Sequence, residues 1–538
     1  MSPSSTSIEA SQYRTNSKNV TRIFADVTGN IPQVQGRTVA INATGEAALK
    51  GTLTAKLGDD FYYFNMSENK WTSFTNDSRP EFAYNEASQY GFNNANAIVH
   101  TVAQNKADRI YTNEDGFYRF FNNGSHALVG DVSGTYGETG LVVTTTADNI
   151  NIFDNVTTLR EALAFGANYN AKTNKEITIT FDDEAFNEQN KEITLSDKYE
   201  ELRITTGFAG NRDTTRGWTG KTLRITGGMM PGSTEDTRAV TIQRSANASD
   251  NYRIFQAGEL YDSYNDFTVS LENLTIKNGK VNWDDHAGNG GAIYSHGRTN
   301  NWNLTNVSVL NSFAYVENKD LFYFADKECN YGGGLHIYSW DDSKLTVENS
   351  TFYGNEAYSG GGIYVYSHKE NVDVVVANST ITANQSYRNP FNTPGVGAGI
   401  HTYTRNEGAK KRSYVQILNS LVYANYFVNE KPTEEHPESH YAYDVRVADE
   451  HGYIDMAYSI HSYMTKNFTR RGVEALSLLT DGNTMSRVFR DVQHYNDYSV
   501  AQLSEDGRTV AINLDGEAGY KGSLLGKVSN GEVGNGNY

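Results

Sequence analysis

The sequence predicts an all-β protein whose main body is a right-handed parallel β-helix, and three observations lead to this prediction. Short strand-like segments separated by turn residues follow one another from ITITF at 177–181 onward. Asparagine recurs at matching places in the later segments, where its side chain can bond along the axis from coil to coil. Strands that open on small residues precede the asparagine segments, and glycine permits a tight corner there.

The asparagine pattern is clearest in five segments: ENLTIKN (272–278), TNVSVLN (305–311), ENSTFYGN (348–355), ANSTITAN (377–384) and LNSLVYAN (418–425). Their opening residues Asn273, Asn306, Asn349, Asn378 and Asn419 are separated by 33, 43, 29 and 41 residues. Such irregular spacing is expected where loops of varying length leave one face of a solenoid. We therefore expect Asn349 and Asn378 to occupy equivalent corners of successive coils.

The glycine-led strands GGAIYSH, GGGLHIYS, GGGIYVYS and GAGIHTYT alternate in character. Because side chains alternate across a strand, one set is expected to point inward: Ile293, Leu335, Ile363, Ile400, Ser295, Ile337, Val365 and Thr402. The alternate positions should face outward, and all are rings: Tyr294, His296, His336, Tyr338, Tyr364, Tyr366, His401 and Tyr403. Two interpretations remain open. The rings form a stacked ladder that shields the sheet, or a flat face that binds glycans or another copy of the chain.

A short helix is predicted at 158–166, next to the first strand at 141–143. Thr158 followed by Glu161 fits a capping box, and Leu159, Ala162 and Leu163 form an apolar stripe. A β-helix leaves unpaired backbone at its ends, which invites edge-to-edge association. We expect this helix to cap the first coil.

Composition excludes several classes of protein. The formal charge of −18 disfavours binding to phosphate backbones, so we expect no nucleic acid partner. No apolar run approaches the about 18 residues of a membrane span. The one cysteine, Cys329, forms neither an internal disulfide nor a cysteine-based zinc cluster. We expect no metal site or cofactor: Asp-rich loops offer oxygen ligands to calcium, but no EF-hand-type loop occurs.

Acidic clusters are candidate catalytic groups, because other β-helices degrade polysaccharides. The candidates are Asp182-Asp183-Glu184, Asp284-Asp285-His286 and Asp341-Asp342. Glycosidases need two carboxyl groups about 5–9.5 Å apart, whereas adjacent strand residues point to opposite faces. Each cluster lies between predicted strands, where acidic turn residues are ordinary. The sequence therefore predicts no enzyme.

The two ends of the chain repeat each other. GRTVAINATGEAALKGTLTAK at 36–56 matches GRTVAINLDGEAGYKGSLLGK at 507–527, and RIFADV at 22–27 matches RVFRDV at 487–492. This predicts four parts: a segment at 1–56 that closes a preceding module or serves in assembly, a β-rich spacer at 57–140, the β-helix at 141–485, and a closing segment at 486–538 that repeats 21–56. Val39 and Ile41 lie on one face of the first copy, as Val510 and Ile512 do in the second, and we assign all four to assembly. In a longer polypeptide the preceding module would supply the coils that the first copy closes, whereas in a free subunit residues 1–56 should add a strand to the sheet of a neighbouring copy. The alternative is that residues 1–56 fold back on the spacer at 57–140.

The segment TTLREALAFGAN at 157–168 resembles the SLREAI segment of bacterial surface β-helix proteins. The glycine-led strands and Phe352-Tyr353-Gly354-Asn355 are similar to polymorphic outer-membrane protein repeats. The resemblance covers about 141–430 and the closing segment at 486–527. It implies extracellular or cell-surface placement and a structural or adhesive role.

These expectations combine into a functional hypothesis. The chain is expected to be a β-helix module of a tandem-repeat surface protein, or a subunit of a head-to-tail filament or sheath. Its partners would be other copies or neighbouring modules, with glycans or the cell surface as further candidates. The alternative is a β-helix that binds or degrades polysaccharides, including one of the tailspike type.

Overall fold

The computed structural model shows a parallel β-helix, as the sequence predicts. It describes most of residues 141–149, 177–204, 222–228, 240–258, 266–281, 288–314, 330–387, 397–405, 411–428, 440–464 and 468–513, with short stretches at 12–101 and 157–163. The chain divides into two compact units. The first comprises 1–145, 149–182 and 205–219, and the second comprises 146–148, 183–204 and 220–538.

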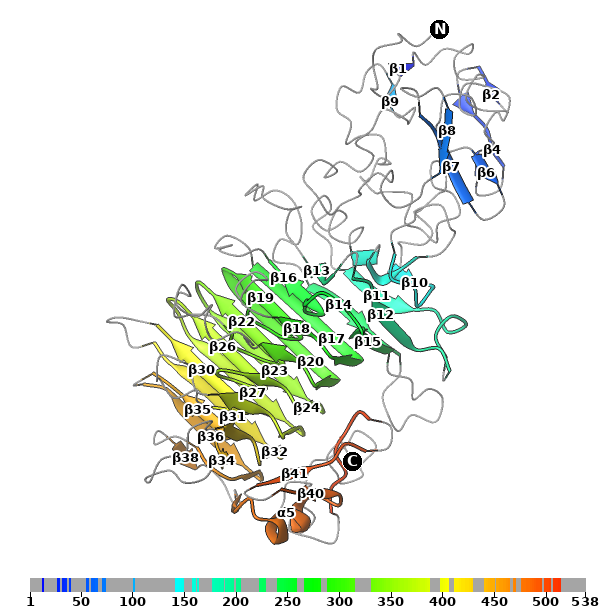
Figure 1. Cartoon of the computed structure of the whole chain (residues 1–538). Coiled ribbons are helices and arrows are strands. Elements are labelled where there is room, and N and C mark those ends of the chain that lie inside the picture. Colours follow the sequence, from blue (N-terminus) through cyan, green and yellow to red (C-terminus); the bar gives the residue numbers. More distant parts are fainter. Residues whose placement is uncertain are drawn as a thin grey trace, which may run out of the picture. The chain divides into compact units, whose positions relative to one another are not determined.

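Three sheets run along the β-helix of the second unit, and their strands form the stacked rows of Figure 1. The long sheet contains β12 (Glu192–Leu195), β14 (Thr222–Thr226), β15 (Val240–Arg244), β17 (Asp266–Lys277), β20 (Thr299–Leu310), β23 (Ser343–Glu348), β24 (Thr351–Tyr353), β27 (Val372–Ala377), β28 (Thr380–Thr382), β31 (Ser413–Leu418), β32 (Leu421–Val422), β36 (Tyr453–Ala457), β37 (Ile460–His461), β38 (Phe468–Arg470) and β39 (Leu476–Ser477). The seven-stranded sheet contains β13 (Leu202–Ile204), β16 (Phe255–Ala257), β19 (Ile293–Gly297), β22 (Leu335–Ser339), β26 (Ile363–Ser367), β30 (Ile400–Thr404) and β35 (Val445–Val447). We call the latter the glycine-led sheet.

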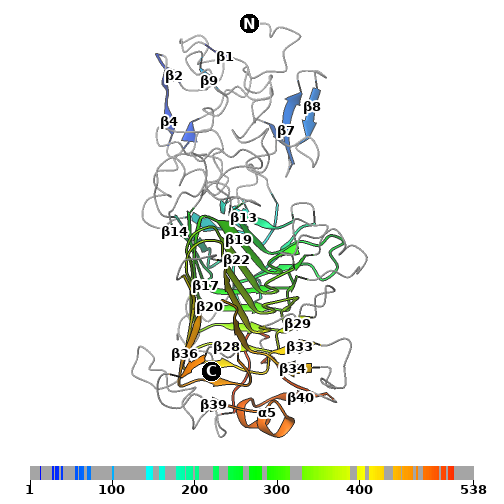
Figure 2. The same ribbon diagram turned by 90° about the vertical axis from the view of Figure 1, so that its left-hand side faces the viewer.

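The third sheet is short-stranded and closes the coils. It contains β18 (Lys280–Val281), β21 (Phe313–Ala314), β25 (Glu356–Ala357), β29 (Gln385–Tyr387), β33 (Tyr426–Val428) and β34 (His440–Ala442). Its strands pair in parallel up to β33, and β34 then pairs antiparallel to β33. In Figure 2, β20 of the long sheet and β29 of the short-stranded sheet lie on opposite sides of the solenoid.

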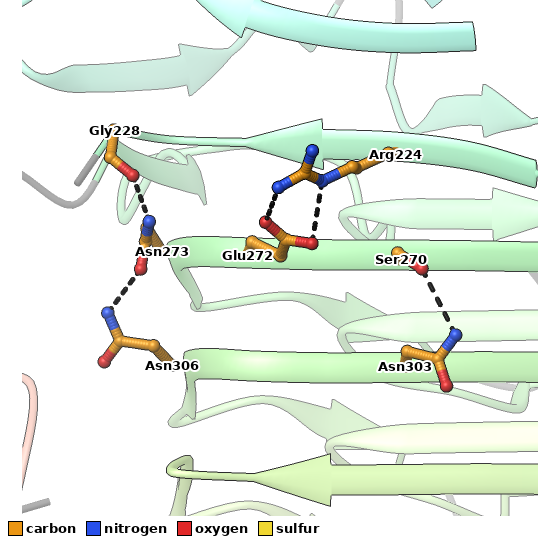
Figure 3. Close-up of polar contacts among 7 residues, drawn as sticks. All are labelled: Arg224, Gly228, Ser270, Glu272, Asn273, Asn303 and Asn306. Atoms are coloured by element: carbon orange, nitrogen blue, oxygen red, sulfur yellow. Dashed lines mark hydrogen bonds and ion pairs between the residues drawn. The ribbon is translucent and has the colours of Figure 1, made fainter. Parts of the chain in front are cut away.

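The opening asparagines make the bends of the long sheet. Asn349 and Asn378 have φ of 54° and 49°, and they separate β23 from β24 and β27 from β28. Asparagine tolerates this left-handed conformation better than most residues. Asn306 Nδ2 donates to Asn273 Oδ1 at 2.6 Å, and Asn273 donates to the Gly228 carbonyl (Figure 3). The predicted equivalence of these corners is confirmed.

A row of buried serines follows the bends, and the pattern of corner asparagines does not predict it. The backbone N–H of Ser350 donates to Ser379 Oγ at 3.0 Å, and that of Ser379 donates to Ser420 Oγ at 3.1 Å. Each hydroxyl donates in turn to the carbonyl two residues earlier. The recurring Asn-Ser pair at 349–350, 378–379 and 419–420 was the available signal.

The second asparagine of each segment forms an inner row. Asn355 Nδ2 donates to Asn384 Oδ1 at 2.9 Å, and Asn384 Nδ2 donates to Asn425 Oδ1 at 2.8 Å. All three residues are fully buried. The row supplies acceptors and donors to corner backbone groups that the sheets do not pair, such as the N–H of Ser312, which donates to Asn355 Oδ1.

The core is aliphatic and follows the predicted columns. Ile293, Leu335, Ile363 and Ile400 are all 0% exposed and stand in register across β19, β22, β26 and β30. Their companions two residues on, Ser295, Ile337, Val365 and Thr402, are also fully buried. Each strand pairs in parallel with the next. This part of the fold prediction is confirmed residue by residue.

The first unit contains strands and the predicted helix. The strands are β1 (Gln12–Tyr13) with β9 (His100–Thr101), β2 (Val27–Thr28) with β3 (Ile31–Pro32), β4 (Val34–Gln35) with β5 (Thr38–Val39), β6 (Ala55–Leu57) with β7 (Asp60–Asn65) and β8 (Lys70–Ser73), and β10 (Leu141–Val143) with β11 (Ile177–Phe181). Leu159 and Leu163 are helical, with 1% and 0% exposure. The Ala162 N–H donates to the Thr158 carbonyl, as expected when Thr158 is the N-cap. The Thr158 hydroxyl donates to the Asn149 carbonyl, and Glu161 lies outside the described residues.

Candidate functional site: the ring face and the closing segment

The predicted rings form two rows on the outer side of the glycine-led sheet. Tyr294, His336, Tyr364 and His401 stand in register on neighbouring strands. The ring centroids of His336 and Tyr364 lie 5.0 Å apart and those of Tyr364 and His401 lie 4.9 Å apart, with nearly perpendicular planes. Such edge-to-face packing is favourable for rings with opposite charge at face and edge.

The second row contains His296, Tyr338, Tyr366 and Tyr403. Its neighbouring ring centroids lie 4.4, 4.7 and 5.6 Å apart. The two rows together place all eight predicted residues on one face. The stacked-ladder interpretation therefore describes their geometry.

Most of the outward-facing rings are buried. Six of them are between 1% and 7% exposed, and only Tyr338 and Tyr403 are half-buried. Neighbouring rings cover one another, and further rings flank the rows: Tyr331 stacks on Tyr364 at 4.6 Å, and Trp340 contacts Tyr338. The alternation of side chains along a strand predicts to which face of the sheet each side chain points, but it does not predict what packs on that face.

His336 has the least ordinary environment in the rows. It is 1% exposed, and among the residues that the structure describes no group hydrogen-bonds to either ring nitrogen. Burial lowers the pKa of His336 well below its usual value, and the nearby charges of His296 and Arg253 lower it further. His401 is similar: burial lowers its pKa, while Ser359 Oγ contacts its Nδ1. Both imidazoles are thus held neutral.

The described members of the acidic clusters lie in turns. Asp341 and Asp342 lie in the turn between β22 and β23, and Asp342 Oδ1 accepts the Asn371 N–H at 3.2 Å. Asp182, Asp183 and Glu184 follow β11 in a turn, and Asp284, Asp285 and His286 lie outside the described residues. Within the described ranges, no group of three or more His, Cys, Asp or Glu side chains is placed to hold a metal ion. No helix of the described part is long and apolar enough to span a membrane.

The closing segment is a helix followed by an antiparallel meander. It consists of α5 (Gly482–Val488), β40 (Val492–His494), β41 (Ser499–Ala501) and bridges that join Leu503 to Val510 and Phe489 to Ile512. The predicted assembly residues Val510 and Ile512 are 2% and 7% exposed. They belong to a buried cluster with Leu421, Tyr423, Ala424, Tyr426 and Ile460 of the β-helix.

This segment does not extend a sheet of the β-helix within the described residues. β40 and β41 form a separate two-stranded sheet, and the segment packs through side chains. Two hydrogen bonds fix it further: the Tyr426 hydroxyl donates to the Ser499 carbonyl, and Ser308 Oγ donates to the Arg508 carbonyl at 2.7 Å. Val39 lies in β5, paired with Val34, whereas Ile41 lies outside the described residues.

The fold places the chain among parallel β-helix proteins. No protein-family model matches it, and no curated protein matches it. A solved structure described as Geobacillus virus E2 ORF18 is similar at a TM-score of 0.27 and 9% identity, covering 78% of this chain and 68% of that one.

Proposed function

We propose that this chain is an extracellular structural protein, a β-helix module of a tandem-repeat surface protein or a head-to-tail subunit of a filament or sheath. The observation that carries the proposal is the closing segment. It packs on the last coils through Val510 and Ile512, and the sequence that contains these residues recurs at 36–56. A repeated closing element is typical of modules that stand in series.

The interior of the β-helix supports a structural role. Rows of asparagine and serine side chains satisfy the corners, and the core columns are fully buried. The resemblance of the segment at 157–168 to bacterial surface β-helix proteins supports extracellular or cell-surface placement and an adhesive role. Six buried rings leave Tyr338 and Tyr403 as half-buried stacking surface, so glycan binding is the secondary candidate.

Particle length tests the proposal. The closing segment of each chain is present beside its own last coils at an effective concentration on the order of 1 mM, and residues 1–56 of a neighbouring chain must compete with it there. The purified chain should therefore be studied near that concentration. Negative-stain microscopy should show end-to-end assemblies, and deletion of residues 1–56 should shorten them to single particles. Assemblies of undiminished length without residues 1–56 would contradict the proposed connection.

A further inference from the structure

The N-terminal copy of the repeat has the same antiparallel pairing as the closing segment. In the first hairpin, Val27 pairs with Pro32, as Val492 pairs with Ala501. In the second hairpin, Val34 pairs with Val39, as Leu503 pairs with Val510. The first hairpin of the N-terminal copy is four residues shorter and the second is two residues shorter, which together account for the shorter spacer between its two conserved stretches. The sequence repeat is therefore also a repeat of backbone topology.

The residues that hold the closing segment in place recur in the N-terminal copy. Phe489, Val510 and Ile512, which pack on the β-helix, correspond to Phe24, Val39 and Ile41. The match continues upstream into α5. Its N-cap Asp481 and buried Met485 correspond to Asn16 and Val20, an equally good N-cap and another apolar residue. We call residues 16–42 the N-terminal copy from here on.

The surface that receives the closing segment is polar at Ser308, whose hydroxyl donates to the Arg508 carbonyl, and becomes apolar in the last two coils. One outward position of the long sheet carries Ser308, Thr351 and Thr380 in successive coils. In the last two coils the same position carries Leu421 and Ile460. Outward apolar side chains on a β-helix need a cover, and here the closing segment supplies it. We call Leu421, Tyr423, Ala424, Tyr426 and Ile460 the closing site.

We infer that the N-terminal copy binds the closing site of a second β-helix of this kind, in the same way that residues 481–513 bind their own. This inference rests on the proposed function and names its connector. The contact residues are the same, so the two segments compete for one surface. Within one chain the closing segment has the advantage of its high effective concentration. A closing site whose own segment is disabled is the partner that the N-terminal copy fits.

The test disables the closing segment and asks whether the chain then assembles. In the full chain, Val510→Asp with Ile512→Asp places two carboxylates in the buried cluster and should release the segment. The vacated closing site should then accept the N-terminal copy of another molecule. Light scattering at micromolar concentration should give a weight-average mass at least twice that of the unaltered chain. The matched control adds Val39→Asp and Ile41→Asp, and should return the mass to that of the unaltered chain.

Each other result overturns the inference. An unchanged mass for Val510→Asp/Ile512→Asp means that the closing site accepts no second copy. An equal rise in mass with Val39→Asp/Ile41→Asp present means non-specific association of the exposed apolar surface. A monomer whose melting temperature falls on adding Val39→Asp/Ile41→Asp means that the N-terminal copy binds its own chain.

A peptide of residues 14–42 tests recognition of the closing site without assembly. It also gives a second readout in case the variant folds poorly. Added to the Val510→Asp/Ile512→Asp chain, it should raise the melting temperature, and the same peptide with Val39→Asp and Ile41→Asp should not. No rise with either peptide overturns the inference. The proposed function is tested separately by assembly of the unaltered chain. If the variant binds the peptide but the unaltered chain forms no filaments, only the proposed function is contradicted.

Discussion

Asp444 accepts the last hydrogen bond of the inner asparagine row, from Asn425 Nδ2 to Asp444 Oδ1 at 3.0 Å. Each earlier member of the row is an asparagine, which accepts from one coil and donates to the next. A carboxylate cannot donate, so the row ends here. Its second oxygen accepts from the backbone N–H groups of Ser462 and Tyr463 and from the Ser462 hydroxyl. Asp444 therefore closes the row and anchors the turn after β37.

Replacing this carboxylate by its amide should destabilise the protein. In Asp444→Asn, an NH2 group faces either the donors of Ser462 and Tyr463 or those of Asn425, so buried donors lose their acceptor. We expect the free energy of unfolding to fall by about 2–4 kcal/mol, measured by urea denaturation. Asp250→Asn, at an exposed position after β15, is the matched control and should change it by less than about 0.5 kcal/mol. An equally small effect of Asp444→Asn would show that the row needs no acceptor at its end.

Truncation of the aliphatic column should destabilise the solenoid strongly. Leu335 is fully buried between Ile293 and Ile363 of the adjacent coils. Leu335→Ala should lower the free energy of unfolding by about 2–5 kcal/mol, because it leaves a cavity in a packed core. Thermal unfolding followed by circular dichroism measures the effect. Lys344→Ala, at an exposed position of β23, should leave the melting curve unchanged.

The serine row gives a third prediction. Ser379 Oγ accepts the Ser350 N–H and donates to the Ala377 carbonyl. Ser379→Ala leaves the buried Ser350 N–H without its acceptor and should cost about 1–3 kcal/mol. Hydrogen exchange should show faster exchange of the Ser350 amide. Protection of that amide equal to the unaltered chain would contradict the role assigned to the row.

Acid should destabilise the ring face. The unfolded pKa of histidine is about 6.5, and burial holds the pKa of folded His336 below that value. The unfolded chain therefore binds a proton that the folded chain does not, and stability falls as pH drops below about 6.5. Burial raises the pKa of Asp444 to about 6, so the folded chain binds this proton more tightly than the unfolded chain does. The effect of Asp444 on stability is therefore opposite to that of His336, because the stability that its protonation contributes is lost as pH rises toward 6.

His336→Phe isolates the histidine contribution, because Asp444 is unchanged in that variant. The difference in unfolding free energy between the unaltered chain and the variant should shift by up to about 1.4 kcal/mol per pH unit below 6.5. Urea denaturation from pH 7.5 to 5 measures it. His451→Gln, at an exposed site, is the control for the loss of a histidine. A pH-independent difference for His336→Phe would mean that folding leaves the pKa of His336 unchanged.

The sequence by itself determined the β-helix, its corners and its core columns. Corner asparagines such as Asn349 and Asn378 repeat because a left-handed bend recurs in each coil, and Leu335 alternates with rings because strands have a period of two. The recurrence of Val39 and Ile41 as Val510 and Ile512 is likewise evident from the sequence alone.

Only the tertiary structure decided what lies above each face. The rings beside His336 are buried because neighbouring coils and flanking rings cover them, and strand periodicity carries no information about such covering. In the same way, Val510 and Ile512 pack sideways on Leu421 and Tyr423 rather than extending a sheet. Local pattern fixes the direction of a side chain, whereas its partner depends on segments distant in sequence that packing brings together.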